Sequence, residues 1–503
     1  MSAYPEEHPE LANVRRDALI SLGDTPQTDV AQVEYTRARV AHWDRVARSF
    51  DVERTWATAY HQRLAHVYRT LIAPGQRVLE IGCGRGDLLN AVEPSYGIGI
   101  DFSGDMIDRG SARYPHLQFI KADAHTLRLE ERFDVVILSD LVNDLWDVQA
   151  VFRRLHRVTT PRSRVIMHFY SRVWEAPLQA LRKLGLARPV LEQNWLTTED
   201  VSTLLRLADF EFMRHWEEVL LPLELPAIAS IANKYLARLW PLNIASLANF
   251  VVARQTPHPR PAQLEPTVSV IVPARNEAGN IANIFERTPE MGAGTELVFV
   301  EGHSTDNTAE VIEREMVRHP DRKSRMFRQT GRGKGDAVRL GFAGAGGDVL
   351  MILDADLTVA PEDLPRFVDA LQAGTGEFIN GVRLVYPMEK QAMRFFNFLG
   401  NKFFSLAFSW LLGQPVKDTL CGTKALWASD YQRIASQRAY FGDFDPFGDF
   451  DLLFGAARLN LKIVDLPIRY RERTYGTTNI QRWRHGQLLL RMVVFAARRI
   501  KFV

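Results

Sequence analysis

The sequence predicts an α/β protein of two domains, each built on a mainly parallel β-sheet. Short apolar strands alternate with helical patterns in two separate runs, at residues 78–139 and 268–354, as βαβ units require. Between the runs, residues 254–266 are rich in proline and lack a periodic apolar pattern, which is typical of a semi-rigid linker. A length of 503 residues also exceeds what one hydrophobic core usually serves.

The composition is that of an ordinary globular protein, with 46% hydrophobic residues and a net charge of +2. This charge gives no reason to expect nucleic acid as a partner. Cys83 and Cys421 lie far apart in the sequence, so we expect neither a disulfide framework nor a zinc site, as in a reducing compartment. The N-terminus lacks a signal-peptide core, and no stretch reaches the ~20 apolar residues of a spanning helix. We therefore expect a cytoplasmic protein.

The first domain is expected at residues 33–253, after a flexible arm at residues 1–32. Helical apolar spacing covers residues 33–71, and residues 171–250 are expected to add helices that cover the sheet. The strands expected between these regions are Val78–Ile81, Gly97–Asp101 and Phe133–Ser139.

A glycine-rich turn follows the first of these strands, in the run VLEIGCGRGDLL at Val78–Leu89. Gly82, Gly84 and Gly86 allow the backbone to approach a ligand closely, and the helix that follows favours an anionic group at its N-terminus. Asp87 stands where a dinucleotide-binding fingerprint has its third glycine, which argues against NAD.

Acidic residues follow the next strands of the same domain. Asp101 ends the strand IGIDFS, where a carboxylate can accept both ribose hydroxyls, and Asp123 could accept from an adenine amine. Together with Glu80 and the strand that ends at Asp140, this order resembles the class I S-adenosylmethionine-dependent methyltransferases over residues 35–255. The residues that the resemblance assigns to S-adenosylmethionine are Glu80, Gly82, Gly84, Gly86, Asp101, Asp123 and Asp140.

The methyl acceptor is less defined by the sequence. Residues 140–144 read DLVND rather than the N-P-P-Y of amino-methylating enzymes, and no catalytic cysteine pair is present. We therefore expect methylation of an oxygen on a small molecule or a glycan. His168 could act as a general base near neutral pH; the alternative is a histidine packed in the core.

In the second run, strands are expected at Val268–Pro273, Leu297–Glu301, Ser324–Arg328 and Val349–Asp354. Asp354 and Asp356 come at the end of the apolar run VLMILDAD. Two carboxylates at this spacing suit a hard divalent cation, Mg²⁺ or Mn²⁺, that can hold a diphosphate. The sequence thus predicts a site for a nucleotide-activated group.

The order of motifs VSVIVPARNE, LVFVEGHSTDNT, GKGDAVRLGF and LDAD resembles the inverting family 2 glycosyltransferases of GT-A fold, over residues 267–480. Within that family it is most similar to the dolichyl- and polyprenyl-phosphate sugar transferases. The resemblance assigns Asp354 and Asp356 to the metal. It assigns the nucleotide-sugar donor to Pro273, Asn276, Glu277, Glu301, Asp306, Lys334 and Asp336. Gly302 replaces an aspartate common in the family, which leaves the base of the donor open.

On the acceptor side, Arg383 and Arg473 match family arginines that bind phosphate oxygens; the alternative for either is a surface ion pair. The resemblance also points to acidic residues as candidates for acceptor activation: Asp418, Asp449 and Asp451. A sugar hydroxyl would need such a base, whereas a lipid phosphate is already largely ionised. The acceptor therefore stays open between polyprenyl phosphate and a glycan.

Two apolar segments suggest contact with a membrane surface. Residues 390–413 are aromatic and weakly charged, and residues 481–503 are expected to form a basic amphipathic helix. The alternatives are a buried helix pair or a dimer contact for the first, and a core-packing helix for the second.

The sequence thus predicts a bifunctional enzyme of surface glycan or glycolipid assembly, peripheral at the inner face of the cell membrane. The alternative is a glycosyltransferase with a module that binds S-adenosylmethionine without catalysis. A sugar nucleotidyltransferase would need a glycine-rich activation loop after the first strand, and PARNEAGN does not provide one.

Overall fold

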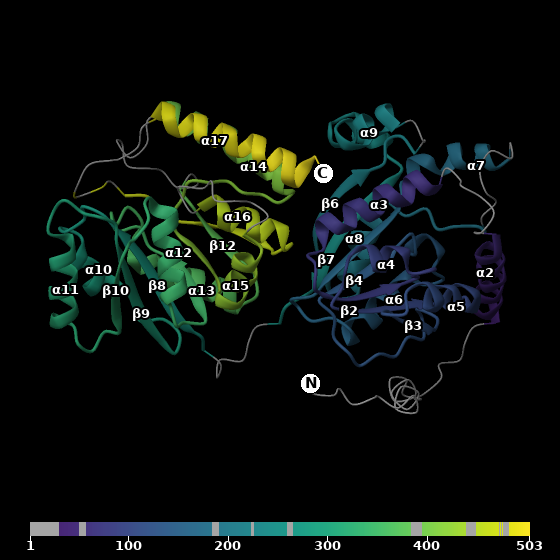
Figure 1. The fold of residues 1–503 in the computed structure, drawn as a ribbon, viewed down its shortest axis with the longest axis horizontal. Helices are drawn as coiled ribbons and strands as arrows, with labels where there is room; N and C mark the ends of the chain where they lie inside the picture. The colour runs from purple at the N-terminus through teal and green to yellow at the C-terminus, as the bar shows by residue number, and fades with distance from the viewer. Residues whose placement is uncertain are drawn as a thin grey trace, which may run out of the picture. The chain divides into compact units, whose positions relative to one another are not determined.

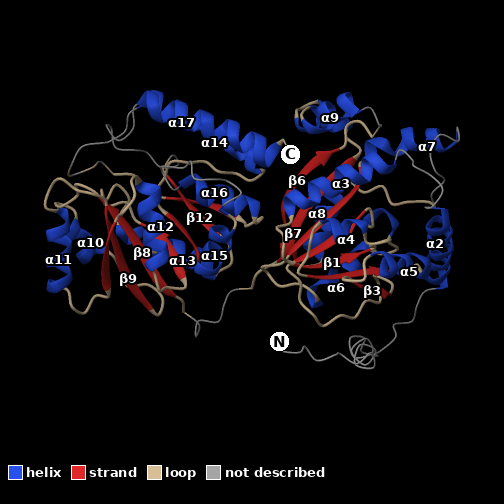
Figure 2. Cartoon of the chain, viewed as in Figure 1, coloured by secondary structure: helices blue, strands red, loops and turns tan. Residues whose placement is uncertain are grey.

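The computed structural model describes residues 30–49, 57–183, 191–222, 226–258, 265–383, 395–438, 449–471, 473, 475 and 482–502. The chain divides into two compact units, Met1–Thr256 and Pro257–Val503 (Figure 1). Each unit is a β-sheet with helices on its faces (Figure 2). The predicted fold class, two α/β domains with mainly parallel sheets, is confirmed.

The first unit contains a seven-stranded sheet in the order β3-β2-β1-β4-β5-β7-β6. Strands β1 to β5 are parallel to their neighbours, and β7 runs antiparallel to both β5 and β6. The strands are β1 Arg77–Ile81, β2 Tyr96–Asp101, β3 Gln118–Lys121, β4 Val135–Ser139, β5 Arg164–Tyr170, β6 Phe210–Glu218 and β7 Ala248–Gln255. The helices are α2 Val30–Ser49, α3 Ala57–Leu71, α4 Asp87–Ala91, α5 Gly104–Arg113, α6 Val148–Arg154, α7 Glu175–Lys183, α8 Thr198–Leu207 and α9 Pro226–Lys234.

The expectation that residues 171–250 are helical was wrong for β6 and for the start of β7. The apolar run of β7 is buried and too short for its periodicity to distinguish strand from helix. Arg254, expected at the start of a linker, is instead buried in β7, where its Nε donates to Glu211 at 2.8 Å. The regular structure of this unit therefore continues to Gln255.

The second unit also contains a seven-stranded sheet, in the order β10-β9-β8-β11-β13-β12-β14. Only β13 among these strands is antiparallel to its neighbours. The strands are β8 Thr267–Ala274, β9 Gly294–Glu301, β10 Ser324–Arg328, β11 Val349–Ile352, β12 Phe378–Val382, β13 Lys424–Trp427 and β14 Ile463–Pro467. The helices are α10 Ile281–Arg287, α11 Thr308–Arg318, α12 Lys334–Gly344, α13 Pro365–Gln372, α14 Phe395–Leu412, α15 Ala428–Ser436, α16 Asp449–Arg458 and α17 Arg482–Ala496.

The carboxyl ends of β8, β9 and β11 lie at one edge of this sheet because these strands are parallel. The strand β11 ends at Ile352, so Asp354 and Asp356 lie in the loop that follows. Within the described residues, no helix is both long enough and apolar enough to cross a membrane.

Candidate active sites

The glycine turn of the first unit links β1 to α4. Gly82, Gly84 and Gly86 have φ angles of 75°, 51° and 76°, a region that side chains with a Cβ rarely adopt. A Cβ at Gly86 would also lie 2.5 Å from the ring of Phe119, whereas at Gly84 it would meet open space. Phe119 therefore packs closely against the turn at Gly86, whereas the turn is open at Gly84, where a ligand can approach the backbone.

Asp101 holds this turn from the end of β2. Its carboxylate accepts hydrogen bonds from the amides of Gly84 and Ser103, both at 2.9 Å. Burial raises the pKa of Asp101, against the lowering effect of these amides. Asp101 thus fixes the conformation of the glycine turn and lies next to Gly84, where the turn is open.

Glu80, in β1, is only 2% exposed, and burial raises its pKa well above the ordinary value. Its Oε2 is buried and has no hydrogen-bond partner among the described residues. A buried carboxyl oxygen without a partner costs free energy unless a ligand supplies one. This atom and the open glycine turn fit a bound S-adenosylmethionine.

Asp123, after β3, accepts hydrogen bonds from the backbone amide of His125 and lies 2.8 Å from His125 Nδ1. Burial acts to raise the pKa of Asp123, but these hydrogen bonds outweigh it and the pKa is lowered. Asp123 is therefore ionised at neutral pH.

Asp140, at the end of β4, lies in a buried polar network that the sequence does not reveal. Its Oδ1 accepts from the hydroxyl of Tyr60 at 2.9 Å and lies 3.1 Å from His168 Nε2. His168 Nδ1 lies 3.0 Å from the hydroxyl of Tyr68. Burial acts to raise the pKa of Asp140, but His168, His61 and Tyr60 together outweigh it and the pKa is lowered. His168 is fully buried and so is not itself exposed to an acceptor.

Helix α2 closes over the loops of this site. The hydroxyl of Ser103 donates to Asp44, and Trp43 Nε1 donates to Asp144 at 3.0 Å. The sequence showed α2 only as a helical pattern, because these two contacts join residues 59 and 101 positions apart.

In the second unit, the predicted donor residues after β8 and β9 join their two loops. Asn276 Oδ1 accepts from the amide of Thr305 at 2.7 Å, and Glu301 accepts from the amide of Ser304 at 2.6 Å. Asp306 Oδ1 accepts from the amide of Thr308 at 3.1 Å. Pro273 lies in β8 beside Val300 of β9. These residues are thus brought to one edge of the sheet.

Asp354 forms an ion pair with Lys334 at the start of α12, with Lys334 Nζ 2.5 Å from Oδ1. Burial acts to raise the pKa of Asp354, but Lys334 and, more weakly, Lys424 outweigh it and the pKa is lowered. Lys424 is fully buried in β13 and was not among the predicted residues. A Cβ at Gly422 would lie 2.1 Å from Asp354 Oδ2, so the loop before β13 packs directly on the carboxylate.

Arg473 joins two of the predicted residues. One of its terminal nitrogens lies 2.9 Å from Asp356 Oδ2 and 3.1 Å from Glu277 Oε1. Burial raises the pKa of Glu277 to about 6, against the lowering effect of Arg473.

Asp354 and Asp356 offer the carboxylate oxygens that Mg²⁺ and Mn²⁺ prefer. Among the described side chains, no group of three or more His, Cys, Asp and Glu could hold a metal ion. A metal that keeps waters and binds substrate phosphates needs only one or two protein carboxylates. The pair therefore fits a cation whose remaining ligands are a diphosphate and water.

Two predicted acceptor-side residues pair with each other. Arg383 donates from Nε and Nη2 to Asp418 at 2.7 and 2.9 Å, and the Asp418 side chain is fully buried. Although burial acts to lower the pKa of Arg383, Asp418 raises it well above its usual range. Asp418 is thus a fixed partner of Arg383 and is not exposed to an acceptor.

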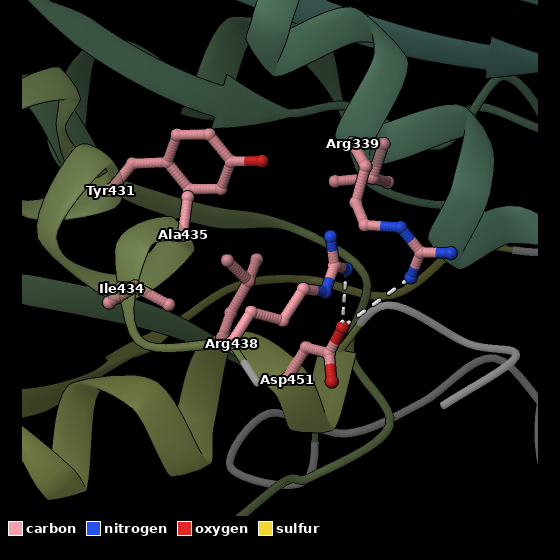
Figure 3. Close-up of a pocket in the computed structure, with 8 residues that line it drawn as sticks. Arg339, Tyr431, Ile434, Ala435, Arg438 and Asp451 are labelled. Atoms are coloured by element: carbon pink, nitrogen blue, oxygen red, sulfur yellow. Dashed lines mark hydrogen bonds and ion pairs between the residues drawn. The ribbon is translucent and has the colours of Figure 1, made fainter. Parts of the chain in front are cut away.

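Asp451 lies beside a small hollow of about 20 Å³ between α12, α15 and α16 (Figure 3). Its Oδ2 lies 2.7 Å from Arg438 and 3.4 Å from Arg339. Arg339 also lies 3.9 Å from Asp336, which accepts from Gln329 at 2.9 Å. The side chain of Asp449, at the start of α16, lies outside the described set.

Each unit contains a stretch that matches the model of a known protein family. Residues 78–162 match the family model described as a methyltransferase domain, and residues 269–423 match that of glycosyl transferase family 2. These ranges contain the glycine turn and Asp354 with Asp356, respectively.

Curated relatives match part of this chain. A polyprenol monophosphomannose synthase of Mycolicibacterium smegmatis is 28% identical over 228 residues, which are 44% of this chain and 84% of the relative. Glycosyltransferase AglJ of Haloferax volcanii is 28% identical over 224 residues, which are 44% of this chain and 69% of the relative.

Solved structures similar to each unit include two enzymes. One is an S-adenosylmethionine-dependent methyltransferase from Mesorhizobium loti, with 22% identity, a TM-score of 0.31, and coverage of 38% of this chain and 96% of its own. The other is glucosyl-3-phosphoglycerate synthase from Mycobacterium tuberculosis, with 21% identity, a TM-score of 0.35, and coverage of 48% and 81%. From the two family matches, we conclude that the chain joins a methyltransferase domain to a domain of glycosyltransferase family 2.

Proposed function

We propose that the second unit transfers a sugar, with inversion, from a nucleotide-sugar donor to a polyprenyl phosphate. The observation that carries the proposal is the cluster of Lys334, Asp354, Asp356, Glu277 and Arg473 at the carboxyl ends of β8 and β11. This cluster places cationic and anionic groups together where a parallel sheet receives its ligand. The relatives named for polyprenol or glycosyl transfer add support through their similarity to part of this chain.

In this proposal, Asp354 and Asp356 hold a divalent cation, whose chemistry is to neutralise the diphosphate that leaves as the sugar–oxygen bond breaks. Lys334 and Arg473 lie against the same carboxylates and would then turn toward the diphosphate oxygens. Asn276, Glu277, Glu301 and Asp306 order the two loops that border the nucleotide.

The two acidic candidates whose side chains the structure describes favour a phosphate acceptor over a sugar hydroxyl. Asp418 is fully buried against Arg383, and Asp451 is held by two arginines. Neither is placed to take a proton from a hydroxyl, whereas a lipid phosphate attacks as an anion. Asp418 would instead orient Arg383, whose remaining N–H groups can bind the acceptor phosphate.

For the first unit, we propose methylation of an oxygen with S-adenosylmethionine as methyl donor, within residues 33 to 255. Glu80, Asp101, Asp123 and the glycine turn would bind the cofactor, which supplies an electrophilic methyl group. Asp140, ionised and backed by His168, would accept a hydrogen bond from the acceptor hydroxyl and align it. Both activities would serve one assembly pathway for a surface glycan or glycolipid at the inner membrane face.

The test is an assay of the purified full chain with labelled donors. Sugar label should pass from one nucleotide sugar to an added polyprenyl phosphate, and only with Mg²⁺ or Mn²⁺ present. Methyl label should pass from S-adenosylmethionine to a glycan or glycolipid extract. Sugar transfer without any methyl transfer would instead favour a first unit that binds S-adenosylmethionine without catalysis.

A further inference from the structure

The most unusual surface of the first unit is formed by α9 and by the two short helical turns Leu236–Arg238 and Leu242–Ala245 that follow it. Large apolar side chains lie exposed along it, with Trp240 at 81% and Ile228 at 63%. The other members that carry the argument are Ile231, Tyr235, Leu239 and Ile244, each more than a third exposed. We call this set the α9 face; Figure 2 shows α9 beyond the end of β6.

Helix α9 turns its small residues inward and its large residues outward. Ala229 and Ala232 are buried, whereas Ile228, Ile231 and Tyr235 form an exposed stripe at helical spacing. A helix that only covers a protein core buries its largest apolar side chains. The reversed arrangement indicates that the apolar stripe faces another apolar phase.

Polar groups anchor the α9 face from beneath. Glu218 in β6 is fully buried and pairs with Arg238 and, at 3.1 Å, with Arg63. The side chain of Asn233 bonds both the amide and the carbonyl of Leu221 at 2.8 Å. Buried charges are costly unless paired, and here they are paired. These contacts fix the segment in a defined position, in which its large apolar side chains are exposed.

The charge of the segment indicates what covers it. Residues 226–248 contain no aspartate or glutamate, and their charged residues are Lys234 and Arg238. Arg238 points inward to Glu218, whereas Lys234 lies beside the ring of Tyr235 at 5.9 Å. Tryptophan and tyrosine prefer the interface of a bilayer, and a lysine on a segment without acidic residues is attracted to anionic headgroups. Besides Glu218, a carboxylate outside the segment that bonds to it is Glu217 of β6, which accepts from Asn243 at 3.0 Å.

We propose that the α9 face docks the methyltransferase unit onto the surface of an anionic lipid bilayer. Its apolar side chains enter the boundary between headgroups and acyl chains, and Lys234 lies at the headgroups. The α9 face belongs to the first unit, whereas residues 390–413 and 481–503 belong to the second, and docking requires neither sugar donor nor S-adenosylmethionine. Vesicle binding therefore tests it independently of the proposed transfer reactions.

The experiment is co-sedimentation of the full chain with vesicles of phosphatidylcholine and phosphatidylglycerol in equal amounts. The variant I231S/W240S removes two exposed members of the face. The matched control L207S/V317S replaces exposed apolar residues on α8 and α11. Both are also made in an F403S/L406S background, so that exposed apolar residues of α14 do not mask the effect.

We expect I231S/W240S to weaken vesicle binding by about tenfold or more in that background, with the control unchanged. Binding should weaken again on vesicles of phosphatidylcholine alone. Unchanged thermal unfolding of the variant shows that loss of binding is not loss of folding. Equal binding by the variant and the control would overturn the proposal. So would conversion of a wild-type dimer into a monomer by I231S/W240S without loss of vesicle binding, because the face would then join two copies.

Discussion

Lys334 Nζ lies 2.5 Å from Asp354 Oδ1, and both side chains lie against the backbone of Gly422. The ion pair thus joins the start of α12, the loop after β11 and the loop before β13. In the proposed reaction, the carboxylate binds the metal and the ammonium turns to the diphosphate.

Substitution of Gly422 by alanine should therefore weaken donor binding with little effect on folding. The new Cβ would lie 2.1 Å from Asp354 Oδ2 and 2.2 Å from Lys334 Nζ, and these side-chain ends must move away. We expect at least a tenfold loss of donor affinity by calorimetry. Gly346→Ala is the control, since its Cβ comes no closer than 3.5 Å to another atom. Normal donor affinity in Gly422→Ala would show that this carboxylate does not bind donor.

Substitution of Asp418 by asparagine should destabilise the second unit. Asp418 is fully buried, and asparagine carries no negative charge. The guanidinium of Arg383 would therefore lose its bidentate carboxylate partner. Breaking a buried pair in this way costs about 3–5 kcal/mol of unfolding free energy, measurable by urea denaturation. The more exposed pair of Arg366 and Asp363 is the comparison, where Asp363→Asn should cost about 1 kcal/mol or less. Equal effects of the two substitutions would contradict the structural role of Asp418.

Glu277 should give the stability of the second unit a defined pH dependence. Burial raises its pKa from 4.5 to about 6. Between these values the folded chain keeps a proton that the unfolded chain has released, so stability falls as pH rises through the window. Relative to Glu277→Gln, the wild type should lose about 2 kcal/mol of unfolding free energy from below pH 4.5 to above pH 6. Parallel pH profiles of the wild type and this variant would rule out a raised pKa.

In the first unit, Gly86→Ala should be more harmful than Gly84→Ala. Both positions have positive φ, which costs a non-glycine residue about 1–2 kcal/mol. Only at Gly86 would the Cβ also meet the buried ring of Phe119, at 2.5 Å. We expect lower thermal stability and weaker S-adenosylmethionine binding in Gly86→Ala. Identical melting temperatures for the two variants would mean that the glycine turn is looser than described.

The sequence was sufficient to locate the strands that carry the two sites. Strands such as Val349–Ile352 are apolar and buried, and parallel strands place their carboxyl ends at one edge, so Asp354 and Glu301 could be expected near each other. The roles of the site residues remain predictions.

Sequence patterns did not reveal contacts between distant residues. Tyr60 and Tyr68 resemble core residues of a helix, and nothing local shows that they meet Asp140 and His168. Lys424 sits in a short apolar strand, where its charge gives no sign of Asp354 nearby. The antiparallel β7 was missed because a short apolar run fits a helix as well as a strand. The other antiparallel strand, β6, reads FEFMRHWEE and mixes apolar with charged residues, so it has no apolar run that would mark it as a strand.

The central claim is that Asp354 and Asp356 form a metal-dependent donor site, and calorimetry tests it most directly. GDP-mannose, UDP-glucose, UDP-N-acetylglucosamine and UDP-galactose would each be titrated into the full chain with Mn²⁺, and into the variant D354A/D356A. We predict that one donor binds only with metal and that the double substitution abolishes its binding. Donor binding that persists unchanged in the variant, or without any metal, would contradict the claim.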